Sequence, residues 1–255
     1  MGLIQTFGAF VGISGLLSGV MADPFNGTPP QSYGILFFPA FDVIDVYGPL
    51  EVLQSLGSLH HIEVSFIAET LEPVSSERLM VDKLNSTGFP SLTPTHTIHD
   101  SPELDVMIVV GGPGMTSNNL NATIDFIREK TPQVKQLITI CTGSGLAARS
   151  GVLDGKMATT HKTSWPDIIT YGPNTTWLPD KRWVEDESGS PPIWSSSGVS
   201  SGLDLMLHFV ETYYSLENAT FVSKMLEYVR HTDPNDDPFA YNGTLSARNC
   251  RRDRN

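Results

Sequence analysis

The chain has 255 residues, of which 40% are hydrophobic and 17% charged, so it can bury one large core and is neither intrinsically disordered nor a small disulfide scaffold. Lys and Arg number 16 against 28 Asp and Glu, and the resulting net charge of −12 argues against nucleic acid or an anionic membrane as a partner. Cys141 and Cys250 lack the C-x-x-C spacing of a zinc site, and no Cys or Glu completes a set with His96 and His99, so we expect no metal.

The amino end predicts a signal peptide over residues 1–22. Residues 3–22 carry no charge, are short for a membrane span and end in the small-residue pattern Val20-Met21-Ala22. No Lys or Arg precedes this stretch, and the opening Met-Gly-Leu-Ile-Gln-Thr also fits a myristoylation pattern.

Asparagine sequons favour secretion. The chain has 11 Asn residues, for which chance predicts about two N-x-S/T sites. Six occur, all with Thr: Asn26, Asn85, Asn121, Asn174, Asn218 and Asn242. We therefore expect a glycoprotein of the secretory pathway, with no membrane association once the leader is removed.

Apolar runs and turn residues predict an α/β domain over residues 33–231, after a spacer at 23–32. Strands are expected at 33–38, 62–68, 105–110 and 136–140, and helices at 46–56, with Pro49 in the first turn, 121–130 and 142–150. Their alternation, with strands apolar on both sides, indicates a mostly parallel sheet sandwiched by helices. Residues 173–197 suggest short antiparallel pieces at one edge, residues 200–214 and 218–230 two covering helices, and residues 232–255 a solvated polar tail.

Cys141 stands where chemistry is expected in such a sheet. It ends a buried strand, and the small residues Thr142-Gly143-Ser144-Gly145 let a helix begin at once. N–H groups at a helix start would lower the thiol pKa and make a nucleophile. A buried structural thiol fits the same spacing, so the residues alone leave both interpretations open.

Three segments in order carry a resemblance to a known family: Ile138-Thr139-Ile140-Cys141-Thr142-Gly143, residues 151–161 (GVLDGKMATTH) and residues 198–205 (GVSSGLDL). They resemble the ThiJ/PfpI superfamily, and within it the isonitrile hydratase-like branch. The resemblance implies a flavodoxin-like, class I glutamine amidotransferase-like fold, a cofactor-free site for a small molecule, and a homodimer.

The same resemblance implies roles for six residues. Cys141 matches the family nucleophile, on the turn called a nucleophile elbow, and Asp45, within the block FDVIDVYGP at 41–49, matches an acid facing it. N–H groups at Gly111-Gly112 and Thr142 would form an oxyanion pocket, and His161 matches a position near the site whose catalytic use varies. Asp45 could instead only cap the next helix, and we expect Asp42 to face solvent or the loop.

Cys250 raises a conflict, because two cysteines in a secreted chain often pair. A bond to Cys141 would abolish the nucleophile. Because Cys141 is expected at a pocket base and Cys250 in a charged tail, a disulfide between Cys250 and another molecule fits better.

Three functions remain open. The first is hydration of an isocyanide to an N-substituted formamide, with Cys141 as nucleophile and Asp45 as proton shuttle. The second is glyoxalase- or deglycase-type chemistry on reactive carbonyls, whose enzymes commonly carry Glu opposite the cysteine and often His after it, where this chain has Asp45 and Thr142. The third is a non-catalytic binding or oxidation-sensing module. The lack of a DNA-binding motif after the core also predicts no sequence-specific DNA binding, although related cores are fused to AraC-type regulators.

The leader and the sequons generate a first prediction. Made in a eukaryotic secretory host, the protein should lack residues 1–22 and carry N-glycans, because both signals are read cotranslationally. Intact mass before and after glycosidase treatment measures this. An unglycosylated chain that keeps its leader would contradict it.

Overall fold

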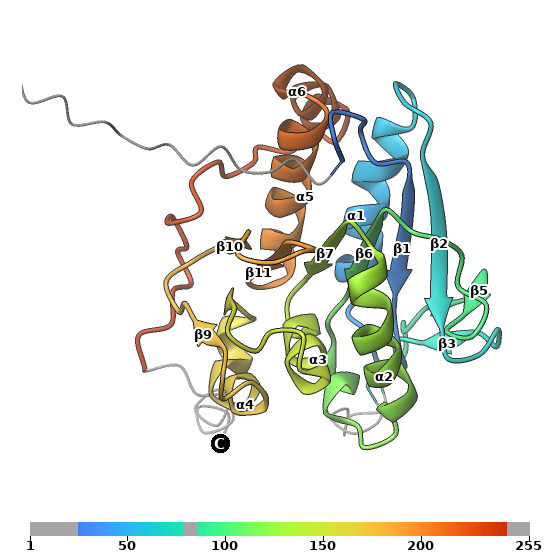
Figure 1. The fold of residues 1–255 in the computed structure, drawn as a ribbon, viewed down its shortest axis with the longest axis vertical. Helices are drawn as coiled ribbons and strands as arrows, with labels where there is room; N and C mark the ends of the chain where they lie inside the picture. Colours follow the sequence, from blue (N-terminus) through green and yellow to red (C-terminus); the bar gives the residue numbers. More distant parts are fainter. Residues whose placement is uncertain (1–24, 79–85, 244–255) are drawn as a thin grey trace, which may run out of the picture.

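The computed structural model describes residues 25–78 and 86–243, which form one seven-stranded sheet with helices on both sides (Figure 1). The strand order is β10-β11-β7-β6-β1-β2-β5, and every neighbouring pair except β10 and β11 is parallel. The strands are β1 (Ser32–Leu36), β2 (Glu63–Ala68), β5 (His96–Thr97), β6 (Val106–Val109), β7 (Gln136–Thr139), β10 (Trp183–Asp186) and β11 (Ile193–Ser196). Both β6 and β7 are buried along their whole length, as a parallel sheet covered on two faces requires. The predicted fold class is confirmed.

The helices form two layers. On one face α1 (Val43–Leu56), α5 (Val199–Tyr213) and α6 (Leu216–Met225) pack together, and on the other α2 (Asn121–Lys130) packs on α3 (Gly143–Ser150). The two crossovers explain this, because right-handed connections from β1 to β2 and from β6 to β7 run in opposite directions along the sheet. The strand order therefore reverses between β1 and β6, where open α/β sheets bind ligands.

Shorter elements fill the connections. Two small ladders pair β3 (Val74–Ser75) with β4 (Ser91–Leu92) and β8 (Met157–Ala158) with β9 (Thr176–Trp177). The remaining helical pieces are α4 (Trp165–Ile168) and the 3-10 turns Pro113–Thr116, Thr131–Gln133, Lys162–Ser164 and Ile169–Tyr171.

Two helix boundaries differ from those expected. Helix α1 begins at Val43, not at residue 46, so Asp45 lies in its first turn and Pro49 in its second. At that position Pro49 lacks the N–H that would bond to the Asp45 carbonyl, and the expectation that it stands in the first turn is wrong. Helix α6 ends at Met225, before residue 230, and Glu227 just beyond it has a left-handed φ of 48°, which cannot continue the helix.

The tryptophan-rich segment forms the expected antiparallel edge in part, since β10 and β11 do so whereas β9 pairs in parallel with β8 in a separate ladder. Strand β10 runs antiparallel to β11, and β11 joins β7 in parallel. Trp183 and Trp194 are buried there, and Trp194 stacks on His208 of α5. Burial of both indoles accounts for their presence in two otherwise polar strands.

The segment after α6 packs against the domain as far as residue 243. The Arg182 N–H donates to the Pro234 carbonyl at 2.8 Å, and the Tyr241 N–H donates to the Pro179 carbonyl at 2.9 Å. Asp237 is only 8% exposed. Most residues of this stretch are exposed, as expected of a solvated polar segment, but it is anchored to the domain at these points and is not a free tail.

Several sequence-based features lie outside the described residues: the leader, Asn85 and Cys250. Of the sequons inside them, Asn26, Asn121, Asn174 and Asn242 are exposed, whereas Asn218 is partly buried and its amide meets His60 Nε2 at 2.6 Å. No helix within residues 25–78 and 86–243 is long and apolar enough to cross a membrane.

A glycine at the start of α3 generates the second prediction. A Cβ on Gly143 would lie 2.3 Å from the Val109 carbonyl oxygen and 2.8 Å from that of Val110, both main-chain atoms of the neighbouring strand end. Gly143→Ala should destabilise the fold by about 2–3 kcal/mol and lower Tm by about 5 °C, since backbone must move. Gly189→Ala is the control, because its Cβ would meet mainly the end of the Lys156 side chain. Equal melting temperatures for both variants would contradict the prediction.

Candidate active site

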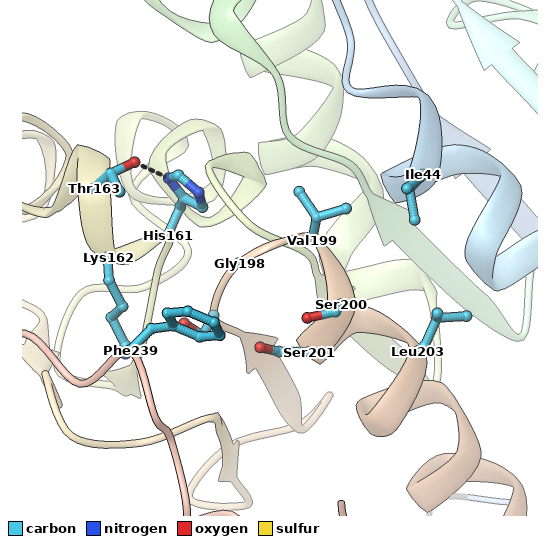
Figure 2. A pocket seen from close by; sticks show the side chains of 11 residues that line it. Ile44, His161, Lys162, Thr163, Gly198, Val199, Ser200, Ser201, Leu203 and Phe239 are labelled. Carbon is cyan, nitrogen blue, oxygen red and sulfur yellow. Dashed lines mark hydrogen bonds between the residues drawn. The ribbon is translucent and has the colours of Figure 1, made fainter. Parts of the chain in front are cut away.

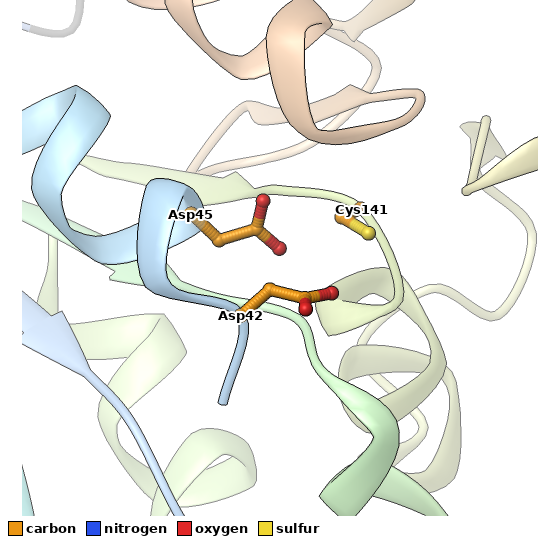
Figure 3. Close-up of side chains that lie close together, drawn as sticks. All are labelled: Asp42, Asp45 and Cys141. Carbon is orange, nitrogen blue, oxygen red and sulfur yellow. The ribbon is translucent and has the colours of Figure 1, made fainter. Parts of the chain in front are cut away.

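The candidate site forms where three parallel strands end at the same level. Leu36 of β1, Val109 of β6 and Thr139 of β7 lie in register, so the loops that follow them meet. These loops carry Asp42 and Asp45, then Gly111 and Gly112, then Cys141. The polar side-chain atoms of Asp42, Asp45 and Cys141 all lie within 4.8 Å of one another (Figure 3).

Cys141 occupies a strained turn between β7 and α3. Its φ is +58°, a left-handed conformation that costs roughly 1–3 kcal/mol in a residue with a side chain. Its carbonyl oxygen accepts hydrogen bonds from Ser144 Oγ at 3.0 Å and Thr160 Oγ1 at 3.1 Å, which hold the turn. The strain aims the thiol at α1, so the proposed nucleophile elbow is present in the backbone.

Asp45 faces this thiol from the first turn of α1. Its side chain is fully buried, and its Oδ2 accepts the Gly111 N–H at 3.1 Å. Its Oδ1 has no hydrogen-bond partner among the described residues. The N-cap of α1 is Asp42, which makes no side-chain cap bond. The carboxyl of Asp45 is therefore directed to the site and is not a helix cap.

Burial controls the protonation of both groups. Burial, reinforced by the nearby Asp42 carboxylate, raises the pKa of Asp45 to about 7, against the opposing effects of the Cys141 thiol and the Gly111 N–H. Burial also raises the pKa of the Cys141 thiol well above its usual value, and Asp45 and Asp42 add to this effect more than the Thr142 N–H opposes it. The expected lowering of the thiol pKa by the helix start is therefore wrong. The pair is a neutral thiol beside a carboxyl that titrates near neutral pH.

Asp42, which was expected to face solvent or the loop, faces loop residues and also belongs to the site. Its carboxylate forms an ion pair with Arg78 and is 18% exposed. The Asp42 N–H donates to the Gly111 carbonyl at 2.9 Å, which ties the β1 and β6 loops together. The spacing of Asp42 and Asp45 could have signalled this, because residues three apart at a helix start project to one side. The position of Arg78, from a distant loop, has no such signal.

The expected oxyanion donors are engaged within the protein. The Gly112 N–H donates to Thr142 Oγ1 at 2.8 Å, and the Gly111 N–H donates to Asp45. Gly112 has φ +149°, and a Cβ there would lie 2.4 Å from the Ala40 carbonyl oxygen, which explains the glycine. Of the expected donors, the Thr142 N–H is the one that acts on the Cys141 sulfur. The Gly112 N–H was expected to be a free oxyanion donor, but in this structure it is occupied by Thr142 Oγ1.

His161 lies at the rim of a cavity of about 250 Å³ that is also lined by Asp42, Gly112 and Thr142. Burial lowers its pKa, so the imidazole is neutral at physiological pH. Its Nδ1 lies 3.0 Å from Thr163 Oγ1 and 3.3 Å from Ser164 Oγ, contacts that orient the ring. The structure places His161 beside the site, and a proton-transfer role for it stays a prediction.

Asp42, Asp45 and Cys141 are also the described groups whose spacing could suit an ion. A metal needs a thiolate and ionised carboxylates, whereas burial favours the protonated forms of Cys141 and Asp45. An ion would therefore have to displace the protons of Cys141 and Asp45 on binding.

The sequence model of the DJ-1/PfpI family matches residues 33–212, and the chain belongs to this family. It is 34% identical over 197 residues to a protein named isonitrile hydratase from Pseudomonas putida, covering 76% of this chain and 77% of that protein. It is also 26% identical over 213 residues to the HTH-type transcriptional regulator GbdR of Pseudomonas aeruginosa, covering 84% of this chain and 55% of the regulator.

Solved structures show the same fold. A ThiJ/PfpI family protein from Pseudomonas syringae superposes with a TM-score of 0.63 at 22% identity, covering 94% of this chain and 93% of that one. Drosophila melanogaster DJ-1beta superposes with a TM-score of 0.61 at 20% identity, covering 78% of this chain and 98% of that one.

The coupled thiol and carboxyl generate the third prediction. Iodoacetamide reacts with the thiolate, so the alkylation rate of Cys141 should rise only at a higher pH than the rate of an ordinary cysteine does. Asp45→Asn removes a negative charge that raises the thiol pKa, so it should move the midpoint of alkylation to lower pH. Asp42→Asn should move this midpoint in the same direction by a smaller amount. Mass spectrometry of the alkylated peptide across a pH series measures the midpoints. An unchanged midpoint in Asp45→Asn would mean that the two groups are not coupled.

Proposed function

We propose that this chain is a cysteine-dependent hydratase that adds water to an isocyanide and releases an N-substituted formamide. The observation that carries the proposal is the buried Asp45 carboxyl, titrating near neutral pH, that faces a neutral Cys141 thiol on a strained turn. The identity of 34% to a protein named isonitrile hydratase, over most of both chains, supports it.

The first step joins a thiol to the terminal carbon of R–N≡C. Asp45 in its carboxylate form takes the proton of Cys141, the sulfur bonds to the isocyanide carbon, and Asp45 delivers the proton to the same carbon. The product is the thioimidate Cys–S–CH=N–R. One proton and one carbon–sulfur bond are accounted for, and Asp45 ends as a carboxylate. A carboxyl with a pKa of about 7 suits both directions of this transfer.

The second step consumes water. Asp45 accepts a proton from water as the water oxygen adds to the thioimidate carbon. The C=N electron pair moves to nitrogen, and Asp45 passes the water proton to that nitrogen. The carbon–sulfur bond then breaks, the hydroxyl proton passes through Asp45 to the sulfur, and HC(=O)–NH–R leaves. The thiol and the carboxylate are regenerated, so no cofactor is required for the balance.

The occupied donors of the β6 loop favour this substrate over a carbonyl compound. Attack of a thiolate on an aldehyde or ketone develops negative charge on oxygen, which needs free N–H donors. Here the Gly111 and Gly112 N–H groups donate to Asp45 and Thr142. Addition to an isocyanide places no charge on an oxygen in its first step. Carbonyl chemistry remains the second candidate.

A peroxide-sensing role is the third candidate, and the thiol chemistry weighs against it. Oxidation of cysteine by peroxide proceeds through an accessible thiolate. The pKa of Cys141 is raised, so little thiolate is present at neutral pH. The secretory setting and the homodimer remain predictions that accompany the proposal.

The mechanism generates the fourth prediction. Cys141→Ala and Cys141→Ser should remove nearly all isocyanide hydration, because neither supplies a comparable nucleophile at neutral pH. Asp45→Asn keeps the size of the side chain but cannot exchange protons, and should lower turnover by about 10²–10⁴-fold. Formamide release measured by chromatography gives the rates.

The matched control is Cys250→Ser, which removes the other cysteine and should leave turnover near that of wild type. Wild-type hydration in Cys141→Ala would refute the mechanism, as would a Cys141–Cys250 disulfide in active protein. Cys141-dependent loss of methylglyoxal with every isocyanide inert would transfer the proposal to the second candidate.

A further inference from the structure

A second cavity, of about 500 Å³, lies beside the site on the Gly198 side of His161. Its apolar wall consists of Ile44, Val199, Leu203 and Phe239, as Figure 2 shows. Phe239 comes from the segment after α6, which the sequence alone suggests is a tail. The cavity therefore joins residues from the start of α1, the start of α5 and the carboxyl-terminal segment.

We propose that this cavity holds the N-substituent of the substrate and that Phe239 is the residue that selects an apolar substituent. The inference rests on the proposed function and adds to it a substrate class: isocyanides whose substituent is large, apolar and uncharged. It also assigns Phe239, from the segment 232–243, to the wall of the substrate pocket.

The cavity adjoins the candidate site at two residues. Ile44 directly precedes Asp45 in the first turn of α1. His161 lines both this cavity and the smaller polar one that contains Asp42 and Thr142. A Cβ on Gly198 would lie 3.0 Å from His161 Cδ2, so glycine there lets the ring lie against the start of α5. His161 thus stands between the polar cavity beside the site and the apolar one, and we infer that the substituent of a molecule bonded to Cys141 passes this ring.

The cavity offers no free charge among its described lining residues. Lys162 contributes to the lining, but its Nζ donates to Thr159 Oγ1 and to the Lys181 carbonyl, each at 2.7 Å, and lies 3.6 Å from Asp237 Oδ2. The side chain is only 3% exposed. Besides His161, the other polar lining side chains are the hydroxyls of Thr163, Ser197, Ser200 and Ser201, so a charged substituent would find no ion-pair partner there, and the cavity favours an uncharged one.

Phe239 is held in place by its backbone although its ring is 62% exposed. The Phe239 N–H donates to Asp237 Oδ1 at 3.0 Å, and Asp237 is buried against Lys162 and Arg182, with Arg182 Nη1 at 3.8 Å. Two residues further on, the Tyr241 ring stacks on Trp165 at 5.7 Å between centroids. An exposed aromatic ring on an anchored backbone is suited to cover an apolar ligand.

The test compares a large with a small substituent on the full-length protein. Benzyl and methyl isocyanide serve as substrates, and N-benzylformamide and N-methylformamide as binding probes that need no turnover. In Phe239→Ala we expect KM for benzyl isocyanide and Kd for N-benzylformamide to rise about 10-fold, and the values for the methyl compounds to change less than about twofold. Asp237→Asn should act in the same direction by releasing the anchor. Val229→Ala, which removes another exposed apolar side chain (90% exposed), is the matched control.

The two kinds of measurement separate this inference from the proposed function. If no isocyanide is hydrated but the benzyl-to-methyl ratio of Kd still rises in Phe239→Ala, the hydratase proposal fails and the cavity assignment stands. Equal effects on both sizes, or none, would overturn the assignment. Unchanged ratios with a lower mass of Phe239→Ala in light scattering would overturn it as well, and would assign this surface to contact between copies of the chain.

Discussion

The contact between a buried carboxyl and a buried thiol organises this protein. Asp45 and Cys141 are each deprived of water, so each resists ionisation, and the proton they handle stays within the pair. Three features of the backbone keep them together. Cys141 has a left-handed conformation, helix α1 begins at Val43 so that Asp45 lies in its first turn, and the loop after β6 carries Gly111 and Gly112. Each of these features carries a local cost that the parallel sheet beneath offsets.

The protonation states of Cys141 and Asp45 limit the kinds of substrate that this pair can convert. A thiolate at rest would suit attack on a carbonyl carbon, provided that free N–H groups await the oxygen. A neutral thiol beside a carboxyl with a pKa of about 7 suits a substrate whose one carbon accepts both sulfur and proton. The hydrogen bonds of Gly111 and Gly112 to side chains of the site point the same way.

A second set of buried charges positions the walls of the site. Arg182 pairs with Asp204 of α5 at 2.6 Å and lies near Asp237, which in turn faces Lys162. Buried ion pairs of this kind contribute little net stability, because desolvation offsets the attraction, but a member left without its partner is costly. The cluster therefore acts mainly to define where the segment 232–243 lies, and this segment carries Phe239 to the cavity.

Local patterns in the sequence determined the parallel sheet and its main helices, because buried strands and helix periodicity are contained in short stretches of chain. The pair Cys141 and Asp45 came from the resemblance of several segments to the ThiJ/PfpI superfamily, since the residues alone left the role of each open. Tertiary structure alone decided the ionisation of that pair, since burial by distant segments outweighs the field of the helix start. It likewise decided that Asp42 and Arg78 enter the site, that Gly112 donates to Thr142, and that Asp237 is buried. Each of these depends on the packing of groups far apart in the chain, which no local pattern records.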